Sequence, residues 1–162
     1  MARIAVAALL GLLVSGLPAG AADDALGKNL IRQLSCSNDP DPTVALLHLE
    51  KTGRIGENDG DRNDGETCWF MKPALKIEGI VFTRICATAD DDALMVEMFP
   101  KFYYRGPGQP NGRLVRLTSK ASVPALRSWA KKVLGSGPYE VGSAGREDDE
   151  KAISCAASSR RQ

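Results

Sequence analysis

Four cysteines constrain the fold of this chain most strongly, because their pairing decides which distant segments can be joined covalently. They lie far apart in the sequence, at Cys36, Cys68, Cys86 and Cys155. No two of them form a Cys-x-x-Cys pair, which weakens the zinc-binding and thioredoxin-like interpretations. In an exported chain, an even number of cysteines is typical of disulfides; four cysteines give two bonds and three possible pairings.

The N-terminal segment predicts that the chain is exported. Arg3 is the only charged residue among residues 1–22, and residues 4–17 are almost entirely apolar. A proline and several small residues follow this run, which is typical of a cleavable signal peptide that ends at Ala21 or Ala22. The apolar run is too short to span a bilayer. We therefore expect a periplasmic or secreted protein without stable membrane insertion.

The composition of the rest of the chain limits its domain count and its partners. Loss of Arg3 leaves 20 of the 21 basic residues against 20 acidic residues. A net charge near zero gives no general attraction to nucleic acid or to an anionic membrane, so we expect another protein or an envelope component as the partner. About 140 residues suit one domain, which we place at residues 23–157, before a disordered tail at residues 158–162.

Two segments near the start of the chain and one near its end predict helices. Leucine and isoleucine recur at helical spacing in residues 24–34. Asp41 is a good N-cap for a second helix, although residues 43–49 also fit a buried strand, because their apolar run does not choose a period. Ser122 caps a later helix that ends at Gly135 and carries two basic residues, four apart, near the solvent.

The middle of the chain is rich in residues that favour β-strands. Strands are predicted at residues 67–71, 79–86, 93–99, 102–104, 114–117 and 151–156. Pro73 interrupts the first of them, so we expect that strand to bulge or to lie at an edge. Residues 56–66 predict a loop. The pattern predicts an α+β fold with one antiparallel sheet of about four to six strands, N-terminal helices, one late helix and two disulfides.

The predicted strand register favours one pairing of the cysteines. Cys68 and Cys86 are equidistant from Ile77, so a hairpin that turns near residues 76–78 places them opposite each other. Cys36 and Cys155 then pair and join the N-terminal helices to the C-terminal end. Directly opposed cysteines strain many disulfides, and a proline in the first strand shifts the register if it causes a bulge, so the alternative pairings stay open.

An acidic loop comes near to a calcium-binding motif. Asp59, Asp61 and Asn63 alternate, as the oxygen ligands of an EF-hand loop do. Such a loop needs glycine at the next position and a carboxylate six residues later. This chain has Asp64 and Phe70 at those positions. A solvated turn is therefore the favoured interpretation, and a calcium-binding structural protein is the third functional hypothesis.

The best candidate binding surface is the tip of a predicted hairpin between residues 102–104 and 114–117. Tyr103, Tyr104 and Arg105 are of the types that are enriched at interface hot spots, and they lead into a loop of glycines and prolines. In the alternative interpretation the tyrosines belong to a strand and alternate rings enter the core. We favour this alternative, because strands commonly carry tyrosine.

Catalytic motifs are weak in this sequence. His48 is the only histidine, and it lies in an apolar segment, so a multi-histidine metal site is excluded. No cofactor motif is found. The first hypothesis is therefore a non-enzymatic binding protein. The second is a small hydrolase or carbohydrate-active enzyme that uses carboxylates, although no pair of carboxylates is selected by spacing.

Overall fold

We describe the fold from a computed structural model of the 162-residue chain. The structure describes residues 19–56, 58–63, 65–89, 93–104, 112–145 and 149–156. Most of the predicted signal peptide and the whole predicted tail lie outside these residues. The predicted cleavage sites, after Ala21 or Ala22, fall in the first turn of a helix. None of the described helices is long and apolar enough to cross a membrane.

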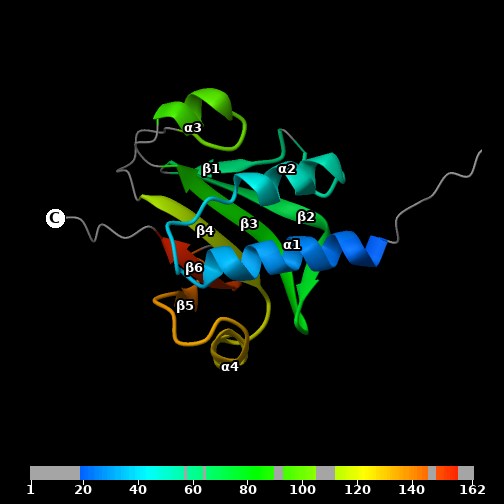
Figure 1. The fold of residues 1–162 in the computed structure, drawn as a ribbon, viewed down its shortest axis with the longest axis vertical. Helices are drawn as coiled ribbons and strands as arrows, with labels where there is room; N and C mark the ends of the chain where they lie inside the picture. The colour runs from blue at the N-terminus through cyan, green and yellow to red at the C-terminus, as the bar shows by residue number, and fades with distance from the viewer. Residues whose placement is uncertain are drawn as a thin grey trace, which may run out of the picture.

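The described residues form a six-stranded antiparallel sheet and four helices (Figure 1). The helices are α1 (Ala19–Leu34), α2 (Thr43–Lys51), α3 (Ala93–Met98) and α4 (Val123–Val133). The strands are β1 (Asp61–Asn63), β2 (Glu66–Ile77), β3 (Ile80–Ala89), β4 (Arg113–Ser119), β5 (Glu140–Ser143) and β6 (Lys151–Ala156). Their order across the sheet is β1-β2-β3-β4-β6-β5. The predicted α+β class is confirmed.

The three predicted helices form where local sequence signals favour them. In α1, the leucines Leu26, Leu30 and Leu34 repeat every four residues and are all buried, so they make one apolar stripe. At the start of α2, the Thr43 amide donates a hydrogen bond to Asp41 Oδ1 at 3.0 Å. This local bond and the contact of α2 with α1 decide between the helix and the strand that the apolar run alone left open.

The late helix begins and ends at the residues that the sequence predicts. The Ser122 hydroxyl accepts a hydrogen bond from the Ala125 amide and caps α4. Gly135 follows the helix with a φ of 77°, a left-handed conformation that glycine adopts without a steric penalty. On the buried side of α4, the Trp129 ring lies edge-on to Phe82, with 5.3 Å between the ring centroids.

A bulge in β2 sets the register of the central hairpin. Between the pairs Phe70–Arg84 and Leu75–Phe82, β2 advances by five residues while β3 advances by two. Pro73 lies in this bulge, as predicted, because proline has no amide hydrogen for a strand ladder. The extra residues on β2 change the pairing of every residue between the bulge and β1.

Both predicted disulfides are present, although the turn differs from the one predicted. The chain turns at Glu78 and Gly79, rather than being centred on residue 77. The bulge offsets this difference, and Cys68 therefore still lies opposite Cys86, with 4.0 Å between the Cα atoms. The second disulfide joins Cys36, just after α1, to Cys155 in β6.

The core lies between the helices and one face of the sheet. A row of side chains crosses four neighbouring strands on this face: Trp69, Ile85, Leu117 and Ile153. All four are completely buried. Figure 1 shows α1 and α2 in front of this face and α4 below the sheet, beside β5.

The strand predicted at residues 93–99 is wrong. Ala93–Met98 forms the short helix α3, and the Phe99 amide donates a hydrogen bond to the Met95 carbonyl. An apolar run of this length fits both periods, so packing decides between them. Here the segment lies beyond the sheet, and Leu94 and Met98 are more than 60% exposed.

The predicted hairpin between residues 102–104 and β4 is also wrong. The amides of Phe102 and Tyr103 both donate hydrogen bonds to the Phe99 carbonyl, which forms a turn instead of a strand. β4 pairs with β3 and β6, so neither of its edges is free for residues 102–104. The prediction of a loop at residues 56–66 is wrong in part, because this segment contains the short edge strand β1.

Candidate functional site

The predicted binding residues are separated by the structure. Tyr103 is 1% exposed, and its hydroxyl forms a short hydrogen bond with the Thr43 hydroxyl. Burial raises the pKa of this phenol well above its usual range. Tyr104 stays at the surface, with the Arg62 guanidinium 5.1 Å from its ring centroid. Arg105 lies outside the described residues. Tyr103 therefore belongs to the core, as the favoured interpretation held for one of the two rings, although it lies in a turn and not in the strand which that interpretation assumed.

The acidic segment is exposed and largely extended. Asp59, Asp61 and Asn63 are all exposed, and the latter two belong to β1. An extended strand does not wrap its oxygen atoms around one ion, so the structure adds no support to the calcium interpretation. The described residues contain one cluster of three side chains of metal-ligating types, Glu66, Cys68 and Cys86. Its two sulfurs are joined to each other.

A polar layer covers part of the sheet face opposite the helices. Arg84 and Glu150 form an ion pair there, with 3.3 Å between Nε and Oε2. Thr83 donates a hydrogen bond to Oε1 of Glu150 at 2.6 Å, and Thr118 donates one to Oε2 at 2.7 Å. The Phe70 ring lies 3.8 Å from the guanidinium. Because both oxygens of this carboxylate accept hydrogen bonds, the layer is better suited to stabilising the sheet than to moving protons.

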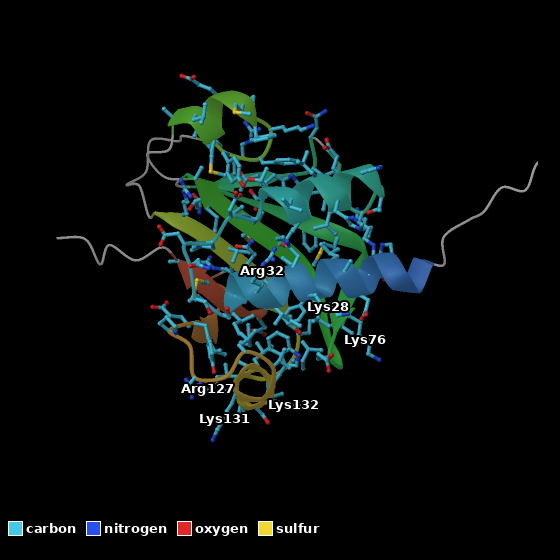
Figure 2. All side chains as sticks on the ribbon, viewed as in Figure 1. Lys28, Arg32, Lys76, Arg127, Lys131 and Lys132 are labelled. Atoms are coloured by element: carbon cyan, nitrogen blue, oxygen red, sulfur yellow. A yellow bond between two sulfur atoms is a disulfide. The ribbon has the colours of Figure 1, made fainter. Side chains whose placement is uncertain are left out.

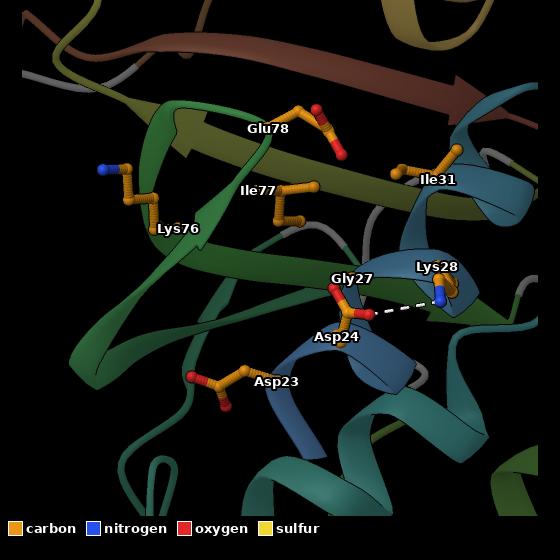
Figure 3. A pocket seen from close by; sticks show the side chains of 8 residues that line it. All are labelled: Asp23, Asp24, Gly27, Lys28, Ile31, Lys76, Ile77 and Glu78. Atoms are coloured by element: carbon orange, nitrogen blue, oxygen red, sulfur yellow. Dashed lines mark ion pairs between the residues drawn. The ribbon is translucent and has the colours of Figure 1, made fainter. Parts of the chain in front are cut away.

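A small cleft opens between α1 and the turn that joins β2 to β3 (Figure 3). Its volume is about 150 Å³, which is below the usual size of a pocket for a drug-sized ligand. Its charged side chains are of both signs: Asp23, Asp24, Glu78, Lys28 and Lys76. Two of the carboxylates are already engaged, since Asp24 pairs with Lys28 at 3.2 Å and Asp23 pairs with Arg54 at 2.7 Å.

The larger feature is a group of cations that begins at this cleft and extends over α4. We call it the basic surface, and define it by six exposed side chains that Figure 2 labels: Lys28, Arg32, Lys76, Arg127, Lys131 and Lys132. They come from α1, the end of β2 and α4. Lys28 and Arg32 lie four residues apart in α1, and Arg127 and Lys131 lie four apart in α4, so each of these pairs shares one side of its helix. Lys132 directly follows Lys131.

Two contacts to backbone carbonyl groups bring these elements together. The Trp129 indole of α4 donates a hydrogen bond to the Ile77 carbonyl at 3.0 Å, next to Lys76. Further along, Gly137 lies against the Ser35 carbonyl at the end of α1, so closely that a Cβ atom there would be 2.4 Å from that oxygen. These contacts place α4 and the segment that follows it beside the end of β2 and the end of α1, although the sequence separates these segments by many residues.

Most charges of the basic surface have no counterion among the residues that the structure describes. Lys28 pairs with Asp24. For the other five cations, no carboxylate oxygen of the described residues lies within 4.0 Å. Solvated like charges that gather without counterions repel each other, and an anionic partner relieves this repulsion.

Sequence analysis found only part of this surface. The spacing of Arg127 and Lys131 predicts a shared helix side, but no local signal connects them with Lys28 and Arg32 on another helix. The chain matches no protein-family model, and neither a curated protein nor a solved structure is significantly similar to it.

Proposed function

We propose that this protein is an exported, non-enzymatic binding protein whose basic surface contacts an anionic component of the cell envelope. Five cations on three neighbouring elements, without counterions in the described part of the chain, carry this proposal. The two disulfides indicate an oxidising environment, which agrees with export. The apolar N-terminal segment supports a cleaved signal peptide, and cleavage after Ala22 makes Asp23, held by Arg54, the first residue.

The carboxylate-dependent enzyme gains no support from the described residues. A general acid or base must reach its substrate and exchange a proton with it. Glu150 is 2% exposed and fully hydrogen-bonded, and Asp23 is held by both of its oxygens against Arg54. The cleft beside Asp24 and Glu78 is small. Binding therefore accounts for the observed surface better than catalysis does.

Retention on a soluble polyanion tests the proposal. The protein is isolated as the cell processes it, with both disulfides formed, and is mixed with inorganic polyphosphate at low salt. We expect binding that weakens steeply between about 50 and 300 mM salt, because the contacts are solvent-exposed and screened. The variant Lys131→Gln/Lys132→Gln should bind about tenfold more weakly, since each exposed cation contributes on the order of 0.7 kcal/mol.

A control variant with the same loss of charge distinguishes an effect of the basic surface from an effect of the net charge. The variant Lys51→Gln/Lys72→Gln removes two exposed cations from α2 and from the β2 bulge, outside the basic surface. It should bind polyphosphate within about twofold of the parent protein. Absence of polyphosphate binding, or an equal loss in both variants, contradicts the proposal.

A further inference from the structure

We propose that the anionic partner is the headgroup layer of an anionic bilayer, to which the basic surface attaches peripherally. This inference rests on the proposed function and narrows it to one class of partner. Three observations favour a bilayer over an anionic protein: the composition of the surface, the types of its cations and the distribution of charge around it.

The described part of the basic surface has little apolar character. Protein interfaces depend on a few large aromatic or aliphatic side chains that are buried at the centre of the contact. Among the described residues, the large exposed hydrophobic side chains are Val44, Leu47, Phe70, Val81, Leu94, Met98 and Tyr104. None of them belongs to α1 or α4, and Val81 is the one that lies beside the basic surface, because it pairs with Lys76 across β2 and β3. A partner at this surface therefore meets charge with one valine at its edge and no aromatic side chain, which suits phosphate headgroups.

The cations are mostly of the type that binds mobile phosphates. Four of the six are lysines, whose ammonium groups are point charges on long flexible stems, whereas a fixed phosphate site favours the planar fork of arginine. They are spread over three elements, and the cleft at their edge is small and partly acidic. Such an arrangement contacts many headgroups at once and does not select one of them.

The charge is concentrated on one part of the molecule although the predicted mature chain is close to neutral. Near the basic surface, the acidic side chains of the cleft are Asp23, Asp24 and Glu78, and Arg54 neutralises the first of these. Glu140 at the start of β5, the strand that packs against α4, is also exposed. Six cations therefore outnumber these three acids, and the surface is net positive. Interactions between exposed charges are screened beyond about one Debye length, which is roughly 8 Å in physiological salt. The attraction to a bilayer therefore depends more on this local excess of positive charge than on the net charge of the protein.

Vesicle sedimentation tests the inference. The processed, disulfide-bonded protein is mixed with vesicles of phosphatidylglycerol and phosphatidylcholine in equal parts, and with vesicles of phosphatidylcholine alone. We expect sedimentation with the anionic vesicles only, and about tenfold weaker binding of Lys131→Gln/Lys132→Gln. The α1 variant Lys28→Gln/Arg32→Gln should show a similar loss, whereas Lys51→Gln/Lys72→Gln should stay within about twofold of the parent.

The outcomes separate the two proposals. Binding to polyphosphate without binding to anionic vesicles overturns the bilayer and leaves the proposed function in place. Failure to bind either one overturns both. Equal binding to neutral and anionic vesicles, or vesicle binding that neither basic-surface variant weakens, also overturns the inference. Melting temperatures of all variants must match that of the parent, because Lys131 and Lys132 also lie at the carboxyl end of α4, where cations stabilise a helix.

Discussion

Arg84 and Glu150 form an almost completely buried ion pair, with 3.3 Å between Nε and Oε2 and side chains that are 9% and 2% exposed. It joins the central strand β3 to the residue that precedes β6. Two threonine hydroxyls and an aromatic ring complete the surroundings of the pair. Each charge depends on the other, because a buried charge without a partner costs several kcal/mol.

Replacement of Glu150 by glutamine should therefore destabilise the protein strongly. The variant leaves the Arg84 guanidinium buried and without a counterion, and we expect a loss of about 3 kcal/mol in the free energy of unfolding. Urea denaturation measures this loss. The control Asp24→Asn breaks the exposed pair with Lys28 and should change the free energy by less than about 0.5 kcal/mol. Equal effects in the two variants contradict a structural role for the buried pair.

The two disulfides should differ in their contribution to stability. Cys36–Cys155 closes a separation of 119 residues, and Cys68–Cys86 closes one of 18 residues. In the chain-entropy model, these separations correspond to about 5 and about 3 kcal/mol of stabilisation. Alanine replacement of each cysteine pair, followed by denaturation, measures the two losses. A larger loss for Cys68–Cys86 would show that the native state, and not the unfolded chain, dominates the effect.

Tyr103 should make stability fall at high pH. Its raised pKa means that the folded state keeps the phenol neutral, whereas the unfolded chain ionises near pH 10. The stabilisation is therefore present below about pH 10 and is lost above it, by at most about 1.4 kcal/mol per pH unit. Denaturation at about pH 8 and pH 11 should show a smaller decrease in the Tyr103→Phe variant.

That variant has a separate cost at neutral pH. Loss of the phenol leaves the buried Thr43 hydroxyl without this hydrogen-bond partner, which should cost about 1 kcal/mol. Ultraviolet titration of the parent protein checks the same residue directly, because Tyr103 should ionise only as the protein unfolds. Ionisation of all three tyrosines near pH 10 in the folded protein would contradict the assignment.

Replacement of Gly137 by alanine should disturb the contact between the segment that follows α4 and the end of α1. The new Cβ atom would lie 2.4 Å from the Ser35 carbonyl oxygen, and this backbone atom cannot turn aside as a flexible side chain can. We expect a loss of about 1 to 3 kcal/mol in thermal or urea denaturation. The control Gly142→Ala adds a Cβ atom with no heavy atom within 4 Å and should be nearly neutral. Equal stability of the two variants would contradict this contact.

Local signals in the sequence were sufficient for much of the secondary structure. Ser122 and Gly135 marked the ends of α4 correctly, because caps and left-handed glycines act within one turn of the chain. The predicted N-cap Asp41 is one residue too early, because Pro42 is the N-cap of α2. The strand at residues 151–156 was predicted with the bounds that β6 has. Residues 93–99 were predicted wrongly, because a short apolar run carries no clear period and its conformation depends on what it packs against.

The disulfide pairing could be predicted from the sequence only in part. The equal distances of Cys68 and Cys86 from residue 77 predicted their pairing, which the structure confirms. The turn at Glu78 and Gly79 alone would have misaligned them, and the bulge around Pro73 restores the alignment. A sequence shows that proline breaks a ladder, but the number of residues in the bulge depends on how both strands pack.

The sequence by itself determined the α+β class and the prediction of export, because these depend on local periodicity, residue counts and spacing. It favoured the correct cysteine pairing, but the bulge in β2 decided it. Only the tertiary structure placed the Tyr103 ring in the core and gathered Lys28, Lys76 and Lys131 on neighbouring elements. The net charge of a sequence does not show where its charged residues lie in the folded protein. Positions were decided by contacts between segments far apart in the chain, such as the hydrogen bond from Trp129 to Ile77.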